Sequence, residues 1–187
     1  MAAAQPGSGT SQWTVYGERT IYSNPWVSLA LADVQVPSGE RFEHHVVRMP
    51  QASILVVLDE RERVLLMWRH RFIADRWGWE LPGGVVDDDE DPAVTAARET
   101  EEETGWRPRS VRHVVTFQPM VGTLDSLHHV YIAPSADKVG DPTGEAEAER
   151  VAWVPLDDVL GLIRDGKIWN SGTLVGLLHL LASRVSL

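Results

Sequence analysis

The first fifty residues alternate between apolar and polar side chains in short runs, and this pattern predicts strands. The runs WTVY, WVSLALADVQV and RFEHHVVR lie between Trp13 and Arg48, and Pro37–Gly39 supplies a turn before the last run. A period of two places successive side chains on opposite faces of a sheet. We therefore expect N-terminal strands over residues 13–50. The preceding residues 1–12 have neither the basic start nor the apolar stretch of a secretory signal, and we expect a disordered leader there.

Residues 51–187 carry a second pattern that predicts a compact core. ASILVVLD (52–59) is a nearly continuous apolar run, which is typical of a strand buried on both faces. The charged tip DERER separates it from VLLMWRHRF (64–72), so we predict a hairpin between these two runs. WGWELPGG then interrupts the pattern with proline and glycine.

The remaining elements follow from the same periodicities. Strands are predicted at VRHVVTF, HHVYIA and RVAWVP, helices at LDDVLGLIRDG and SGTLVGLLHLLASR, and a mobile loop at ADKVGDPTGEAEAE (136–149). The chain shows neither an internal repeat nor a linker between domains. Residues 13–187 are therefore expected to form a single domain of the α/β (α+β) class, with a mixed sheet and a few covering helices.

A further helix is predicted from its two ends. Asp91 before a proline is typical of an N-cap followed by proline at the first helical position, and Gly105 is a favourable residue just after a helix. These signals predict a helix over Pro92–Thr104. Val94 and Ala97 give that helix a small apolar side with which to pack.

The predicted helix carries an unusual density of glutamates. Glu99, Glu102 and Glu103 share one helical face, whereas Glu101 lies roughly 200° away from Glu99 and is assigned to solvent. Like charges one turn apart destabilise a helix by a few tenths of a kcal/mol. The face is therefore either a solvated acidic surface or a site for a divalent cation, since Mg²⁺ is held by carboxylates, water and substrate phosphates.

Composition narrows the classes of function. The net charge of -10 argues against a protein that binds the nucleic-acid backbone, and the lack of cysteine excludes disulfides and thiolate chemistry. A cysteine-free chain fits a reducing cytoplasm. No apolar run reaches the roughly 18 to 20 residues that a membrane span requires. The pairs His44-His45 and His128-His129 do not indicate zinc, because adjacent strand residues point to opposite faces.

Seven positions in fixed spacing decide how the acidic helix is interpreted. Gly84 is followed after five residues by Glu90, and after seven more by RETEEETG, which ends at Gly105. From average residue usage, such a coincidence is expected about once in 10⁸ to 10⁹ windows. The pattern resembles the signature of the Nudix hydrolases: G, five residues, E, seven residues, REUxEExGU, with U bulky and apolar. Thr100 departs from the usual aliphatic residue, and Trp106 satisfies the last bulky position.

The resemblance implies a fold, a reaction and a ligand set. The fold would be an α/β/α sandwich with an N-terminal β extension, and the reaction the metal-dependent hydrolysis of a pyrophosphate linkage. Bound cations offset phosphate repulsion and lower the pKa of an attacking water. The ligands of Mg²⁺, or of Mn²⁺ in its place, would be the Gly83 carbonyl, Glu99, Glu102 and Glu103. Arg98 would orient these glutamates, and we count Arg98, Glu102 and Glu103 as catalytic.

Outside this signature the chain is similar to the ADP-ribose pyrophosphatase branch of the family. WRHRF before WELPGG, the run ending in HVYIA, RDGKIWNSGTLVGLL and the N-terminal strands carry the likeness. It implies a cytoplasmic homodimer, with the N-terminal strands exchanged or packed across the interface, that converts ADP-ribose to AMP and ribose 5-phosphate. Pro119 comes early in its loop, which keeps other substrates open: a sugar nucleotide, a dinucleotide or a nucleoside triphosphate. A non-catalytic module that senses a nucleotide is the other alternative.

The same branch suggests further site residues, each with an alternative. Arg71 is a candidate phosphate contact or an arginine at a strand edge, because a guanidinium suits anionic oxygens. Trp26 either stacks on the base of the substrate or fills the core. Glu80 either bonds within the site or holds the turn. The general base would be Glu147; the other acidic candidates are Glu145, Glu149 and Asp125, and all three loop glutamates could instead only solvate their loop.

Overall fold

The computed structural model describes residues 11–143 and 148–185. The predicted leader therefore lies almost entirely outside the described residues. The chain forms two compact units. The N-terminal unit contains the residues up to Met49 together with Met120–Asp125, and the larger unit contains Pro50–Pro119 and the residues from Ser126 onward. No helix in the described part of the chain is long and apolar enough to cross a membrane.

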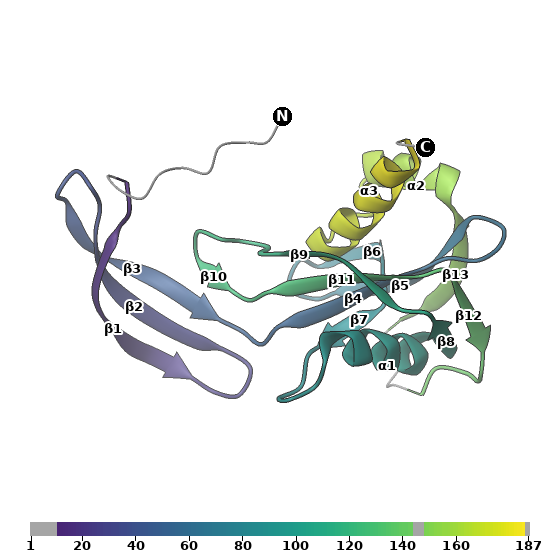
Figure 1. Ribbon diagram of the computed structural model, residues 1–187, viewed down its shortest axis with the longest axis horizontal. Coiled ribbons are helices and arrows are strands. Elements are labelled where there is room, and N and C mark those ends of the chain that lie inside the picture. Colours follow the sequence, from purple (N-terminus) through teal and green to yellow (C-terminus); the bar gives the residue numbers. More distant parts are fainter. Residues whose placement is uncertain (1–10, 144–147, 186–187) are drawn as a thin grey trace. The chain divides into compact units, whose positions relative to one another are not determined.

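The N-terminal unit is a small, mostly antiparallel sheet whose three main strands confirm the alternating pattern (Figure 1). β2 pairs antiparallel with both β1 and β3, and the short β10 pairs parallel with β3. The predicted turn contains Gly39 at a φ of 94°, a left-handed conformation that favours glycine. The strand bounds are β1 (Thr14–Ser23), β2 (Ser28–Gln35), β3 (Arg41–Arg48) and β10 (Leu124–Asp125).

The larger unit contains three sheets, which are ordered β7-β4-β11-β9, β13-β5-β6 and β12-β8. The first sheet is mixed, because β4 runs parallel to β11 whereas its other pairs are antiparallel. The strands are β4 (Ala52–Val57), β5 (Arg63–Arg71), β6 (Arg76–Glu80), β7 (Gly83–Val85), β8 (Trp106–Arg109), β9 (Arg112–Phe117), β11 (His128–Ala133), β12 (Ser135–Lys138) and β13 (Arg150–Pro155).

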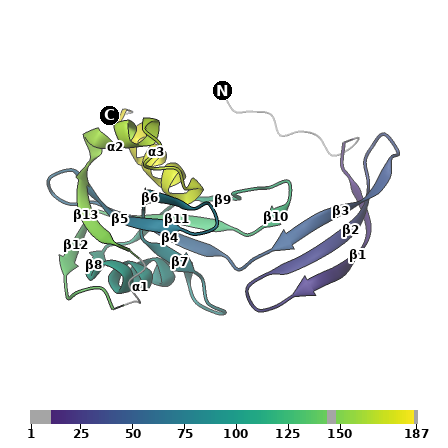
Figure 2. The ribbon, with the colours of Figure 1, turned by 180° about the vertical axis from the view of Figure 1, so that it is seen from behind.

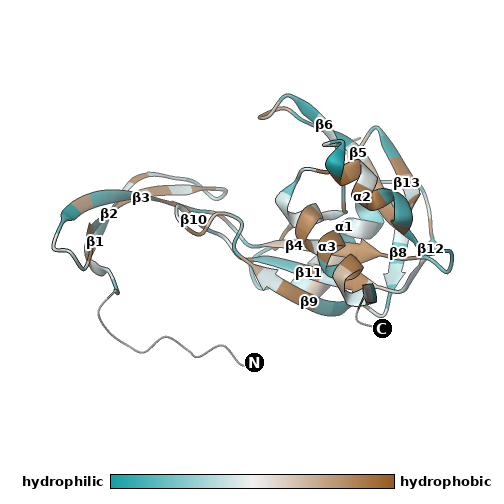
Figure 3. Cartoon of the chain, turned by 90° about the horizontal axis from the view of Figure 1, so that it is seen from above, coloured by the Kyte–Doolittle hydropathy of each residue, from teal (hydrophilic) through white to brown (hydrophobic). Residues whose placement is uncertain are grey.

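Helices cover both faces of these sheets (Figures 1 and 2). α1 (Pro92–Thr104) lies on one face, and α2 (Leu156–Arg164) and α3 (Ser171–Val185) lie on the other. β4 serves both sides: Leu55 and Val57 pack in the core that contains Ala96 of α1, and Val56 packs in the core that contains Leu177 of α3. The apolar colouring of α3 is plain in Figure 3. The predicted α/β/α sandwich is confirmed.

The hairpin predicted between 52–59 and 64–72 is wrong. β4 pairs with β7 and β11, and β5 pairs with β6 and β13, so each strand has both edges occupied within its own sheet. Direct pairing between the two predicted strands is limited to the isolated bridge Leu58–Val64. The run WGWELPGG, predicted as a break, supplies β6 and β7, and the predicted loop 136–149 begins inside β12.

Candidate active site

α1 begins and ends where its capping residues predicted. The Asp91 carboxylate accepts a hydrogen bond from the Ala93 amide at 2.8 Å, and Gly105 has a φ of 70° while its amide donates to the Glu101 carbonyl at 2.8 Å. Its buried face differs from the prediction, however. Val94 is 55% exposed, and the fully covered positions are Ala96 and the threonines 95, 100 and 104. These hydroxyls find partners inside the fold, as when Thr100 donates to the Ala96 carbonyl at 2.7 Å.

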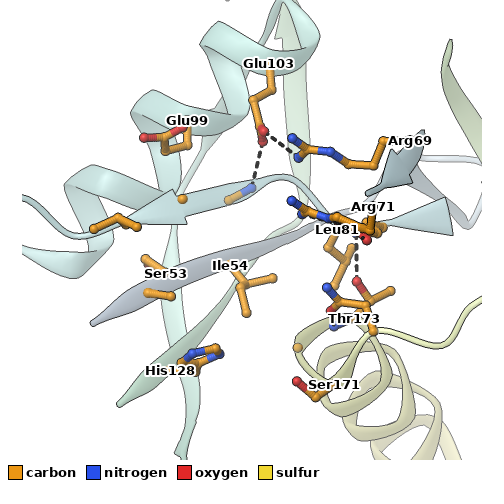
Figure 4. A pocket seen from close by; sticks show the side chains of 17 residues that line it. Ser53, Ile54, Arg69, Arg71, Leu81, Glu99, Glu103, His128, Ser171 and Thr173 are labelled. Atoms are coloured by element: carbon orange, nitrogen blue, oxygen red, sulfur yellow. Dashed lines mark hydrogen bonds and ion pairs between the residues drawn. The ribbon is translucent and has the colours of Figure 1, made fainter. Parts of the chain in front are cut away.

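A pocket of about 420 Å³ lies in the larger unit, between the acidic face of α1 and the start of α3. Figure 4 shows the carboxylates of Glu99 and Glu103 on one side of it and His128 and Ser171 on the other. Its walls also include Arg69 and other residues from β5, β6 and β7. The structure thus brings together residues that lie more than 100 positions apart in the chain.

Glu103 is held by two donors at the wall of this pocket. Arg69 donates from Nη1 to one carboxylate oxygen at 2.8 Å, and the Gly83 amide donates to the other at 2.9 Å. Burial nevertheless raises the pKa of Glu103 to about 7, because the desolvation of the carboxylate outweighs both favourable contacts. Arg69 is itself only 5% exposed, and sequence reasoning missed it. Arg69 and Arg71 are two residues apart and so lie on the same face of their strand, and this spacing was the sequence signal for Arg69.

Glu99 lies directly against the backbone of Gly84. A Cβ at position 84 would fall 2.4 Å from the Glu99 carboxyl carbon and 2.6 Å from one of its oxygens, so the glycine leaves the space that this carboxylate fills. Arg98 donates from Nη1 to Glu99 at 2.8 Å. The glycine that opens the sequence signature therefore has a local steric reason.

Arg98 connects three glutamates of the signature. It donates to Glu90 from Nη2 at 3.0 Å, to Glu99, and to Glu102 at 3.2 Å. The Arg98 hydrogen bond is the largest cause of a fall in the pKa of Glu90 to about 2, and a 2.6 Å hydrogen bond from Thr95 adds to it. Arg98 thus has the contacts expected of an orienting residue. Glu101 points elsewhere and pairs with Arg107 at 2.7 Å on the surface.

Arg71 and Glu80 form an ion pair between β5 and β6. Both line the pocket, and Arg71 donates from Nε to Glu80 at 3.0 Å. Glu80 is only 2% exposed, whereas the Arg71 side chain is 44% exposed. The buried carboxylate therefore holds the arginine, whose side chain stays partly exposed where it lines the pocket.

The donors in the pocket fit a hard divalent cation. Glu99 and Glu103 line it beside the Gly83–Gly84 backbone, and Mg²⁺ commonly takes one or two carboxylates together with water and substrate phosphates. Burial makes ionisation of Glu103 unfavourable and so raises its pKa, and a bound cation would favour the ionised carboxylate. Glu102 turns toward Arg98 and does not line the pocket. Among the residues described, no three carboxylate or imidazole side chains are already grouped as a metal site.

Several predicted residues are not among those that line this pocket. Trp26 belongs to the N-terminal unit and is 67% exposed, so it does not fill a core; the Asn24 side chain accepts hydrogen bonds from the amides of Trp26 and Val27 at 2.8 Å. Asp125 also belongs to the N-terminal unit. Glu149 is exposed and lines a different cavity. The predicted bases Glu145 and Glu147 lie outside the described residues.

Comparisons with known proteins agree with this geometry. A family model described as the NUDIX domain matches residues 47–174. A CMP-5'-(N-acetyl-N-hydroxy-3-aminopropyl)phosphonate hydrolase from Streptomyces rubellomurinus is 56% identical over 170 residues, which cover 91% of this chain and 82% of the relative. An ADP-ribose pyrophosphatase from Bacillus subtilis is 26% identical, with 86% and 88% of the two chains covered.

A solved structure shares the fold across nearly the whole chain. The crystal structure of an ADP compounds hydrolase superposes with a TM-score of 0.81 at 14% identity and covers 96% of this chain and 98% of that one. The family model spans more than half of the sequence and includes the whole signature from Gly84 to Gly105. The chain therefore belongs to the Nudix family of hydrolases.

Proposed function

We propose that this enzyme cleaves the phosphoanhydride that links a nucleoside 5'-monophosphate to a second phosphoryl or phosphonyl group, and that its substrate is an anhydride of CMP with an alkylphosphonate. The reaction class rests on one observation, the pocket in which two glutamates of α1 face two arginines of β5. The substrate rests on the Streptomyces rubellomurinus relative, which is 56% identical over 91% of this chain. Water would release CMP and the free phosphonate.

The proposal gives roles to the charged residues of the pocket, to Gly83, and to Glu102 and Arg98, which do not line it. The Gly83 carbonyl, Glu99, Glu102 and Glu103 would hold Mg²⁺ or Mn²⁺, which neutralises phosphate charge and makes a bound water more acidic. Arg71, whose side chain is partly exposed and lines the pocket, would bind a phosphoryl oxygen while Glu80 holds it in place. Arg69 and the Gly83 amide would keep the Glu103 carboxylate in place. Arg98 would do the same for Glu99 and Glu102.

Glu147 remains the proposed general base. In the family resemblance, the base comes from a loop distant from the signature, and such a group must come within about 2.6–3.2 Å of the water or act through another water. A Glu147→Gln variant should lower kcat and remove the acidic limb of the pH–rate profile, with Glu145→Gln as the matched control. An unchanged rate and profile would remove Glu147 from the mechanism.

ADP-ribose is the second candidate substrate, hydrolysed to AMP and ribose 5-phosphate. The Bacillus subtilis ADP-ribose pyrophosphatase, which aligns over 86% of this chain, favours it. By the same resemblance the enzyme would act in the cytoplasm as a homodimer, and Trp26 would stack on the base of the nucleotide. A non-catalytic nucleotide sensor is less well supported, because Glu99, Glu102 and Glu103 are all present.

The experiment compares both substrates directly. Release of CMP from a CMP–propylphosphonate anhydride and of AMP from ADP-ribose is measured at millimolar Mg²⁺, beside Glu103→Gln. Faster hydrolysis of the CMP compound that is lost in the variant would support the proposal. A preference for ADP-ribose would make ADP-ribose the substrate in place of the CMP compound and would leave the proposed reaction class unchanged. Hydrolysis of neither compound would contradict both, and activity retained in Glu103→Gln would contradict the metal ligands.

A further inference from the structure

The pocket is divided by charge. The end beside α1 and β5 carries Glu99, Glu103, Arg69 and Arg71. The opposite end is lined by uncharged residues of β4, by His128 and by the first residues of α3, and Figure 4 shows His128 and Ser171 on that side. A phosphoanhydride belongs at the charged end, where cationic side chains and acidic metal ligands meet. The far end therefore meets a part of the substrate that is distant from the anhydride.

The surroundings of the His128 ring hold it in place and favour its neutral form. It packs edge-on against Phe117, with ring centroids 5.4 Å apart, and its backbone sits in the sheet opposite Ala52 of β4. Burial lowers the pKa of His128, and the neighbouring His129 lowers it further. A neutral imidazole has one nitrogen that donates a hydrogen bond and one that accepts.

The surroundings of Nδ1 decide which nitrogen carries the proton. Nδ1 of His128 is fully enclosed, and no residue in the described part of the chain forms a hydrogen bond with it. A proton placed there would be a buried donor without an acceptor, which is costly. The proton is therefore favoured on the other nitrogen, Nε2, because the tautomer of histidine follows the hydrogen bonds available to each nitrogen. Because His128 lines the pocket, Nε2 is the nitrogen available to donate to a ligand there.

The start of α3 faces the same space. A Cβ on Gly172 would fall 2.3 Å from Cδ1 of Ile54, so this glycine lets the first turn of α3 pack directly on β4. Asn170 caps that turn by accepting from the Thr173 amide at 2.9 Å. The N-terminus of a helix carries partial positive charge and so favours an oxygen lone pair over a further donor. Two independent features thus point to an acceptor on the ligand.

We propose that His128 is a specificity residue whose Nε2–H donates a hydrogen bond to an uncharged oxygen, such as a hydroxyl, on the part of the substrate distant from the anhydride. This inference rests on the proposed function and deepens it. The far end of the pocket provides no cationic side chain among the residues that line it, so a second phosphate would meet no counter-charge there. An uncharged polar group matches both the donor and the lack of charge.

The test uses two CMP–alkylphosphonate anhydrides that differ by one hydroxyl at the end of the alkyl chain. Wild type should prefer the hydroxyl compound in kcat/KM, and His128→Phe should lose about three- to tenfold on that compound only, mainly through KM. His128→Gln, which keeps a donor, should recover part of the preference. His179→Phe makes the same replacement at an exposed position of α3 and should leave the preference unchanged. Equal effects of His128→Phe on both compounds would overturn the proposal.

A second measurement does not depend on turnover. With Ca²⁺ in place of Mg²⁺ to slow hydrolysis, ¹⁵N-histidine NMR should show His128 protonated at Nε2 and a shift of that resonance with the hydroxyl compound only. Protonation at Nδ1, or no shift at saturating ligand, would overturn the role of His128 even if both compounds are hydrolysed. Hydrolysis of neither compound by wild type, with the Nε2 shift present, would instead contradict the proposed function and leave the His128 contact supported.

Discussion

At the scale of single residues, the site combines favourable contacts with an unfavourable burial at Glu103. Its carboxylate has donors from Arg69 and from Gly83, yet its pKa is raised from 4.5 to about 7. The native state therefore binds more protons than the unfolded state between these two values. The stability of the metal-free protein should consequently decrease as pH rises through this window. Ionised Glu103 costs folding energy that a bound cation would offset.

A Glu103→Gln variant should reveal this cost. In EDTA, the Tm of the variant minus that of wild type should increase from pH 4.5 to pH 7.5, because the amide does not ionise. The gain corresponds to at most on the order of 3 kcal/mol in the free energy of unfolding. Millimolar Mg²⁺ should raise the Tm of wild type at pH 7.5 and leave that of the variant almost unchanged. Thermal unfolding followed by circular dichroism measures both effects. A difference in Tm that is flat with pH would contradict the raised pKa.

Gly84 gives a second prediction at this scale. A methyl group there would displace the Glu99 carboxyl, which is the far end of a flexible side chain, so the fold should survive while a metal ligand moves. Gly84→Ala should need a higher Mg²⁺ concentration for half-maximal activity and should lose at least tenfold in kcat/KM. Gly122→Ala is the control, since a Cβ at that position meets no atom within 4 Å. Equal activity of the two variants would show that Glu99 does not need this position.

The shared face of the glutamates could be predicted from the sequence, but the contact of Arg69 with Glu103 could not. Glu102 and Glu103 lie three and four residues after Glu99, so their shared helix face follows from local geometry. Arg69 meets Glu103 across 34 positions, and that meeting depends on how β5 packs beside α1. A shared helix face also does not determine the direction of each carboxylate. Glu102 points to Arg98 and does not line the pocket.

At the scale of elements, local signals correctly predicted where α1 begins and ends, but the residues predicted to form its buried face were not the right ones. Asp91 and Gly105 act on the backbone groups beside them, so their roles do not depend on the rest of the fold. The choice of Val94 as a packing residue used apolarity alone. Thr100 is buried instead because its hydroxyl bonds to the backbone of its own helix. The predicted hairpin of β4 and β5 failed because strand pairing is not local, and β4 pairs with β11 from a distant part of the chain.

The end of α1 can be tested through Gly105. It combines a φ of 70° with a position where a Cβ would lie 2.2 Å from the Gly140 carbonyl oxygen, so both strain and contact oppose a side chain. Gly105→Ala should therefore lower the free energy of unfolding by more than about 1 kcal/mol in urea titrations. Gly161→Ala, within α2 and with no atom within 4 Å of its Cβ, should be neutral or slightly stabilising. A Gly105→Ala variant as stable as wild type would contradict this account.

At the scale of the whole molecule, the two units differ in what they carry: the larger unit holds the candidate active site, and the N-terminal unit exposes a group of apolar side chains. All residues that line the described pocket belong to the larger unit. The N-terminal unit instead exposes apolar side chains along and beside β1; these are Trp13, Val15, Tyr16, Ile21, Tyr22 and Trp26. β1 pairs only with β2 in the described part of the chain, so its other edge is open. An exposed apolar edge strand promotes association unless it is covered.

This surface is where the expected homodimer can be tested. Light scattering after gel filtration should give a mass of about twice 20.8 kDa for wild type. Val15→Lys combined with Ile21→Lys should shift the protein toward monomer, because charge on an edge strand opposes pairing and the burial of β1. Leu178→Lys, at an exposed apolar position of α3 in the larger unit, is the matched control and should remain a dimer. A monomeric wild type would contradict the dimer itself, whereas a double variant that stays dimeric would move the interface away from β1.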